Sequence, residues 1–192
     1  HVMGHLGAGW LERPERERQE RTDLLIAGLS LSEDFVVADI GAGTGYFTFP
    51  IARRVHRGKV FSVDIQSEML ALITRRKALE NVANVETVLG EADDPKLPDN
   101  EIDLAFIVDA YHEFSFPREM GERLKESLKP GGQLVLVEYR AEDPRVPIKR
   151  LHKMTEEQVK REMAAIGLSW VRTENYLPQQ HVLIFQKARV QP

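Results

Sequence analysis

Val36-Val37-Ala38-Asp39-Ile40-Gly41-Ala42-Gly43-Thr44-Gly45-Tyr46-Phe47 is the stretch of sequence that decides the fold. Its apolar first half predicts a buried parallel strand, followed by a glycine-rich turn and a helix that starts near Tyr46. Glycine tolerates dihedral angles that other residues avoid and lets a ligand lie against bare backbone. The helix N-terminus offers free N–H groups to an anionic part of that ligand. We therefore expect a ligand site here, although a plain tight turn stays possible on this stretch alone.

The spacing of the glycines distinguishes between ligands. A dinucleotide fingerprint, G-x-G-x-x-G, needs a glycine where this chain has Tyr46. The pattern found here, D-x-G-x-G-x-G, instead resembles motif I of the class I S-adenosylmethionine-dependent methyltransferases. The resemblance implies that the acidic residue contacts the methionine amino group, directly or through water, and a carboxylate suits a cationic ammonium. The cofactor-binding residues implied in this stretch are Asp39, Gly41, Ala42, Gly43 and Gly45.

Strands and helices alternate along the rest of the chain, which predicts an α/β fold with helices on both faces of a parallel sheet. A terminal hairpin adds one antiparallel strand. The result is a Rossmann-like, doubly wound, seven-stranded sheet, which is the arrangement that the resemblance implies. We expect one domain over residues 1–192, with a helical cap in 1–30 and a lid loop in 140–154. The expected strands are 35–40, 59–65, 85–89, 102–108, 133–139, 170–176 and 182–187, and the main helices are 46–55, 67–79, 117–128 and 155–167.

Composition narrows the class of partner. The 192 residues carry a net charge of −4, which gives no overall attraction to nucleic acid, so we expect no nucleic-acid partner. There is no cysteine, which excludes thiolate metal sites and a cysteine nucleophile, and we assign no residue to a metal. No apolar run approaches the ~20 residues of a membrane span. We expect a cytoplasmic protein, with its oligomeric state open and, because the chain starts at His1, a removed signal peptide also open.

Carboxylates follow the second and third expected strands. Asp64 lies 19 residues after Gly45, at a sheet edge where a carboxylate can accept both ribose hydroxyls; capping of the next helix is the alternative. Glu91 and Ala92 stand where family members often have an acid and a small residue beside the adenine, although Asp93 and Asp94 compete for that contact. Ile65 can pack on the adenine ring or belong to the core.

The segment Asp109-Ala110-Tyr111-His112-Glu113-Phe114 follows the fourth expected strand, where the resemblance places groups that face both the transferred methyl group and the acceptor. His112 is the leading candidate for a general base, because an imidazole titrates near pH ~6.5. Asp109, also a cofactor candidate, and Tyr111 are the other catalytic candidates, and Glu113 is a candidate substrate ligand. The alternative is that His112 is a polar residue ahead of a helix.

A second set of charged residues follows the fifth expected strand. Arg140, Lys149 and His152 are candidate substrate ligands, although such charges can simply solvate a loop. The nearest resemblance is to small methyltransferases of the ubiquinone/menaquinone-biosynthesis-like group, which implies S-adenosylmethionine as cofactor and favours a small-molecule acceptor. The alternative is a non-catalytic S-adenosylmethionine-binding regulator or partner subunit.

Overall fold

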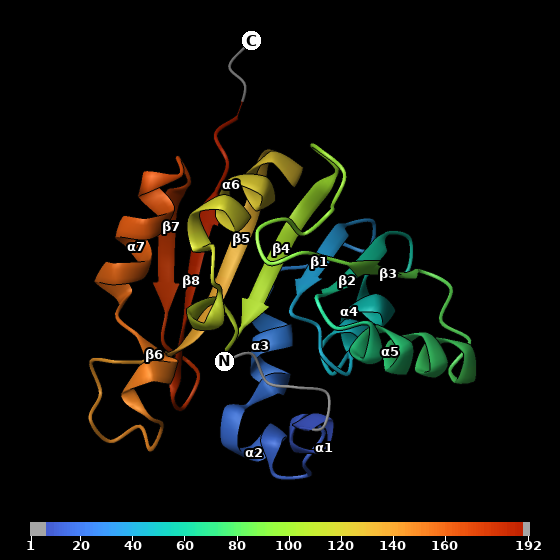
Figure 1. Cartoon of the computed structure of the whole chain (residues 1–192), viewed down its shortest axis with the longest axis horizontal. Helices are drawn as coiled ribbons and strands as arrows, with labels where there is room; N and C mark the ends of the chain where they lie inside the picture. Colours follow the sequence, from blue (N-terminus) through green and yellow to red (C-terminus); the bar gives the residue numbers. More distant parts are fainter. Residues whose placement is uncertain (1–6, 190–192) are drawn as a thin grey trace.

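A single mixed β-sheet organises the chain, described here for residues 7–189 of a computed structural model (Figure 1). Its strands run in the order β3-β2-β1-β4-β5-β8-β7; β5 pairs with β8, and β8 with β7, in antiparallel fashion, while the pairs from β3 to β5 are parallel. The expected seven-stranded Rossmann-like sheet with a C-terminal antiparallel hairpin is confirmed. The strands are β1 Val36–Ile40, β2 Lys59–Asp64, β3 Val85–Leu89, β4 Ile102–Val108, β5 Leu128–Arg140, β7 Ser169–Glu174 and β8 Gln180–Gln186.

A short strand that the sequence does not predict, β6 (Lys153–Met154), also pairs with β5, at Tyr139 and Arg140. Because β8 already occupies one side of Tyr139, β6 lies on the side of β4, whose own pairing with β5 ends at Val108. The chain just before β6 therefore lies beside the segment that follows β4.

Helices cover both faces of the sheet, as expected from the alternation. Strand β5 shows the two layers: Val135 and Val137 pack with α3, α4 and α5, whereas Leu134 and Leu136 pack with α6 and α7. Successive side chains of a strand point to opposite faces, so each strand between the layers is apolar on both sides. The α-helices are α1 Ala8–Leu11, α2 Arg16–Glu20, α3 Thr22–Gly28, α4 Thr48–Arg54, α5 Ser67–Leu79, α6 Pro117–Ser127 and α7 Glu156–Ala165; the 3₁₀ turns are η2 Tyr111–Glu113 and η3 Arg150–His152.

Several predicted boundaries are wrong by a few residues. The N-terminal segment forms three short helices, because Arg21 adopts a left-handed φ of 52° that separates α2 from α3. Residues 1–6 of the expected cap lie outside the described residues. Strand β5 starts at Leu128 and includes a bulge, since Leu128 pairs with Ile102 whereas Gln133 pairs with Leu104.

None of the helices within residues 7–189 has the length and apolar character that crossing a membrane requires.

Candidate functional site

A cavity opens at the carboxyl ends of β1, β2 and β4, where the strand order changes direction. Ligands of open α/β sheets bind at this edge because the loops leaving the strands diverge there. The cavity contains about 980 Å³ of empty space, including its open mouth. Eight of the residues assigned from the sequence line it: Gly41, Gly43, Asp64, Ile65, Glu91, Ala92, Asp109 and Glu113.

The turn after β1 forms one wall of the cavity with its backbone. Gly41 and Gly43 have φ angles of +72° and +54°, in the left-handed region that favours glycine. A Cβ atom at Gly41 would lie 3.3 Å from the Cβ of Ala110 on the opposite segment. Gly41 therefore keeps the space between the turn and the segment after β4 open, whereas a Cβ atom at Gly43 would lie 2.9 Å from the Cδ1 atom of Leu11.

Asp64 ends β2 and joins this turn to the next helix. Its carboxylate accepts hydrogen bonds from the backbone N–H groups of Gly43 and Gln66, both at 2.9 Å. Burial raises the pKa of Asp64 above its usual range. The carboxylate therefore fixes the glycine turn and also faces the cavity, so the turn-stabilising and ligand-facing roles are both available to it.

The far end of the cavity is less polar. Ile65 is 44% exposed and forms its wall together with Met69. Glu91 and Ala92 line it, whereas Asp93 and Asp94, which compete for the adenine contact in the sequence, do not. Asp94 instead accepts a hydrogen bond from the backbone N–H of Lys96 at 2.8 Å.

Asp39 lies behind the glycine turn and does not line the cavity. It is 3% exposed and accepts a 2.6 Å hydrogen bond from the Thr48 hydroxyl, which is also 3.0 Å from the Ser62 hydroxyl. Burial raises the pKa of Asp39 to about 7. Because alternate strand residues face opposite sides, Ile40 lines the cavity and Asp39 faces α4. The contact of Asp39 with a ligand, directly or through water, stays a prediction.

Two further members of motif I also lie outside the cavity lining. Ala42 is buried in the core beside α3 and α4. Gly45 has a φ of +80°, and a Cβ atom there would lie 2.9 Å from the ring of Phe49 and 3.1 Å from Ile73. Both residues pack the turn against the core, and their contacts with a ligand stay predictions.

Asp109 carries the most unusual backbone in the site. It has a φ of +50° directly after β4, a conformation that costs energy in a residue other than glycine. One carboxylate oxygen accepts a 2.9 Å hydrogen bond from the Gln180 amide, and the other, buried, has no hydrogen-bond partner among residues 7–189. Burial and the nearby charges of Glu138 and Glu20 raise the pKa of Asp109 well above its usual range. The buried oxygen without a partner could accept a hydrogen bond from a ligand group that reaches it.

His112 lies at the centre of a hydrogen-bonded chain of side chains. Its Nδ1 atom is 2.7 Å from the Oε2 atom of Glu138, which is fully buried, and its Nε2 atom is 3.0 Å from the Nδ1 atom of His152. The other Glu138 oxygen accepts the backbone N–H of Tyr111 at 2.9 Å. A carboxylate accepts, so His112 donates from Nδ1 to Glu138, and its Nε2 atom accepts a hydrogen bond from the Nδ1–H of His152.

The structure does not bring every predicted residue to the cavity. The Tyr111 hydroxyl donates to Glu162 of α7 at 2.9 Å. Tyr111 and His112 line a second, smaller hollow and not the main cavity, and their catalytic roles stay predictions. The Arg140 guanidinium donates to the carbonyl oxygen atoms of Leu177 and Pro178. Lys149 is exposed on the loop before η3. Neither basic residue lines the cavity, and their contacts with a substrate stay predictions.

Two residues of the site have weak or no signal in the sequence. Glu138 interrupts the apolar run of β5, and a charge at a buried strand position is a usable signal that it has a polar partner. Gln180 is distant in sequence from Asp109 and follows no motif, so only the pairing of β8 with β5 places it there.

Comparison with known proteins gives a consistent result. A family model described as a methyltransferase domain matches residues 37–132. A ubiquinone/menaquinone biosynthesis C-methyltransferase of Hydrogenovibrio crunogenus is 33% identical over 106 residues, which is 54% of this chain and 42% of that protein. An uncharacterized methyltransferase-like protein of Schizosaccharomyces pombe is 31% identical over 126 residues, 66% of this chain and 46% of that protein. The matched region thus spans less than half the length of these relatives.

Solved structures share the fold over nearly the whole chain. The crystal structure of a SAM-dependent methyltransferase from Aquifex aeolicus superimposes with a TM-score of 0.88 at 23% sequence identity. The match covers 96% of this chain and 98% of that one.

Proposed function

Because this chain belongs to the class I S-adenosylmethionine-dependent methyltransferases, we propose that it methylates a small-molecule acceptor that binds beside His112. The observation that carries the proposal is the continuity of the cavity. It runs from the glycine turn and Asp64 to Asp109 and Glu113, so one open space joins the cofactor end to the polar segment after β4.

The residues present fit S-adenosylmethionine. The left-handed glycines leave backbone open to the methionine part, and Asp64 faces the cavity where ribose hydroxyls can donate to it. The unpartnered oxygen of Asp109 suits the methionine ammonium. Ile65 and Ala92 would contact the adenine ring, with Glu91 near its amino group. Asp39 would act on the ammonium only through water, and mainly holds the turn through Thr48.

The chemistry asked of the protein is limited. The bound cofactor supplies a methyl group on a positively charged sulfur, which is already activated for displacement. The protein therefore has to align the acceptor and exclude water. An acceptor that carries a proton on its nucleophilic atom also needs a base. His112 Nε2 can take that proton once its hydrogen bond with His152 opens, while Glu138 stabilises the resulting imidazolium.

The surroundings of the cavity favour a small acceptor. Leu11 at the end of α1 lines the cavity, so the N-terminal helices form part of its cover. We place the proposed lid, residues 140–154, on the His112 side, because His152 contacts His112 there. The net charge of −4 does not favour a nucleic-acid acceptor. The proposal includes a single methyltransferase domain and a cytoplasmic location, as expected from the sequence.

Calorimetry with S-adenosylmethionine, S-adenosylhomocysteine and NAD tests the cofactor. We expect binding of the first two and not of NAD; binding of NAD alone would overturn the proposal. A panel of phenols, carboxylic acids, amines and enolisable ketones then tests the acceptor by release of S-adenosylhomocysteine. With an acceptor in hand, His112→Ala should lower kcat by ~10²–10⁴ while the Kd for S-adenosylmethionine is unchanged. An unchanged kcat would give His112 a structural role.

A further inference from the structure

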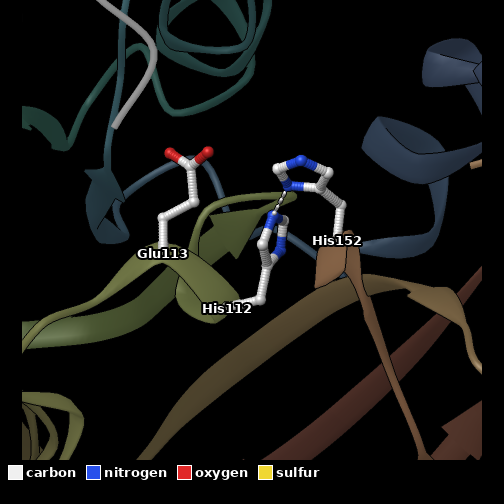
Figure 2. Close-up of side chains that lie close together, drawn as sticks. All are labelled: His112, Glu113 and His152. Carbon is white, nitrogen blue, oxygen red and sulfur yellow. Dashed lines mark hydrogen bonds between the residues drawn. The ribbon is translucent and has the colours of Figure 1, made fainter. Parts of the chain in front are cut away.

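Three side chains with metal-binding atoms meet beside the cavity. His112 and Glu113 belong to η2, and His152 ends η3 immediately before β6 (Figure 2). One ligand atom from each residue lies within 4.8 Å of the ligand atoms of the other two. The pairing of β6 with β5 on the side of β4 brings these distant segments together.

The spacing of the two histidines already suits a shared ion. Ligand nitrogens at ~2.0–2.1 Å from a tetrahedral metal ion are roughly 3.3 Å apart. The Nε2 atom of His112 and the Nδ1 atom of His152 are 3.0 Å apart. One oxygen of the half-buried Glu113 carboxylate lies within 4.8 Å of both nitrogens, so it has to move nearer to them to complete the set.

The buried carboxylate of Glu138 forms a hydrogen bond with the ring nitrogen of His112 that does not face His152. Metal-binding histidines usually donate their second ring N–H to a carboxylate or carbonyl, which fixes the tautomer that leaves the metal-facing nitrogen unprotonated. Glu138 does this for His112 at 2.7 Å, and it is itself fixed by the backbone N–H of Tyr111. A structural hydrogen bond between two histidines does not require this third, fully buried partner.

The donor set indicates the kind of cation. Two imidazole nitrogens and one carboxylate oxygen suit zinc and neighbouring divalent transition metals, whereas Mg²⁺ and Ca²⁺ prefer oxygen ligands alone. The competing cation nearest in sequence, Lys153, is directed away, since its ammonium group donates to the carbonyl oxygen of Val146 at 2.6 Å. The three ligands together bring a single negative charge, so a divalent ion fits without a second counterion.

We propose that His112, Glu113 and His152 bind a zinc-type divalent cation at the boundary between the cofactor cavity and the second hollow. Glu113 lines the first and His112 the second. On binding, the His152 proton moves from Nδ1 to Nε2, so that both facing nitrogens present lone pairs. Three protein ligands leave a coordination position open for a water molecule or an acceptor atom.

The consequence for the acceptor rests on the proposed function. A cation at this position lowers the pKa of a bound hydroxyl or thiol, whose proton then passes to solvent. In the metal-loaded protein the lone pair of His112 is committed to the cation, which takes over the generation of an anionic nucleophile.

Zinc binding is tested by calorimetry with ZnCl₂ alone on the full chain, together with the visible spectrum of the Co²⁺-loaded protein. We expect one equivalent of zinc and no response to MgCl₂. His152→Ala and Glu113→Gln should each weaken zinc binding by at least ~10-fold and alter the Co²⁺ spectrum, and Glu138→Gln should weaken it by ~10–100-fold. His56→Ala is the matched control, because His56 is an exposed histidine that faces Glu33 at 3.3 Å, and a His1→Ala/His5→Ala variant controls for the N-terminal imidazoles.

The metal site and the methyltransferase activity can fail separately. Absence of a zinc equivalent, or affinity unchanged in both His152→Ala and Glu113→Gln, overturns the metal site even where S-adenosylmethionine binds normally. Zinc binding without S-adenosylmethionine binding would overturn the proposed function and leave the metal site standing. Thermal unfolding of each variant confirms that it is folded, and Glu113→Gln, which removes no buried volume, keeps the test valid where a histidine variant unfolds.

Discussion

Replacing Glu138 by glutamine should change which nitrogen of His112 carries the proton. The backbone N–H of Tyr111 is a fixed donor 2.9 Å from one Glu138 oxygen, so the amide oxygen of a glutamine must take that place. The amide NH₂ group then faces His112 Nδ1 across the 2.7 Å contact. Because two donors cannot pair, Nδ1 must lose its proton and Nε2 must gain it.

The size of this change follows from the cost of an unsatisfied buried donor. That cost is about 1–3 kcal/mol, which corresponds to a roughly 5- to 150-fold change in tautomer ratio. The side chains of His112 and Glu138 are 7% and 0% exposed, so water does not readily relieve the conflict. Glutamine keeps the volume of glutamate, and the fold should therefore survive.

Nitrogen chemical shifts of ¹⁵N-histidine-labelled protein above pH 8 measure the tautomer directly. We expect His112 of the wild type to be protonated on Nδ1 and that of Glu138→Gln on Nε2. Glu86→Gln is the control, because Glu86 is an exposed carboxylate that pairs with Lys59 on the far side of the sheet. A Glu138→Gln protein that keeps the Nδ1 proton would refute the reasoning, and with it the assignment of the Nε2 lone pair.

Three further substitutions test the glycine turn and its carboxylates. Gly45→Ala should destabilise the protein by about 1–3 kcal/mol in urea unfolding, because its left-handed φ and the 2.9 Å approach to Phe49 both oppose a Cβ atom; no loss would contradict the described turn. Asp64→Ala should weaken S-adenosylmethionine binding in calorimetry by at least ~10-fold, since it removes the acceptor of the Gly43 N–H and the proposed ribose ligand; equal affinity would remove Asp64 from the site. Asp39→Asn should flatten the pH dependence of stability. The folded-state pKa of Asp39, about 7, lies above the unfolded value, so its contribution is present below pH 4 and is lost as the pH rises through 7. The free energy of unfolding of the wild type should then fall by up to about 4 kcal/mol more than that of the variant between pH 4 and 7, and parallel pH profiles would contradict the raised pKa.

The parts of the fold that the sequence predicts are those set by local pattern. The buried strands and the glycine turn follow from apolar runs and turn residues, and the structure has them within a few residues of the expected positions. The N-terminal segment is divided at Arg21, which has a left-handed backbone conformation. The helix propensity of the sequence gives no indication of that conformation. The early start of β5 depends on its pairing with Ile102, a tertiary contact.

The site shows the same difference between features that local sequence pattern predicts and features that depend on tertiary contacts. Asp64 and Asp109 could be assigned because carboxyl ends of neighbouring parallel strands converge at one edge. The family pattern gives the position of Asp39 in the sequence but not the face of β1 from which its side chain points toward Thr48, and its contact with the cofactor stays a prediction. His152 was grouped with Arg140 and Lys149 by its charge and loop, yet only His152 reaches His112.

The two-residue strand β6, which directly follows His152, holds this residue beside His112. A strand that short has no recognisable sequence pattern, but its pairing at Tyr139 and Arg140 fills the edge of β5 that β4 leaves free. The same pairing turns the Arg140 guanidinium toward the carbonyl groups of the loop before β8. With β6 paired to β5, His152 contacts His112 in the segment after β4, whereas Arg140 binds the loop before β8. The register of β6 therefore determines which side chain lies beside Glu113, because a shift of the register by one residue turns each side chain of a strand to the opposite face of the sheet.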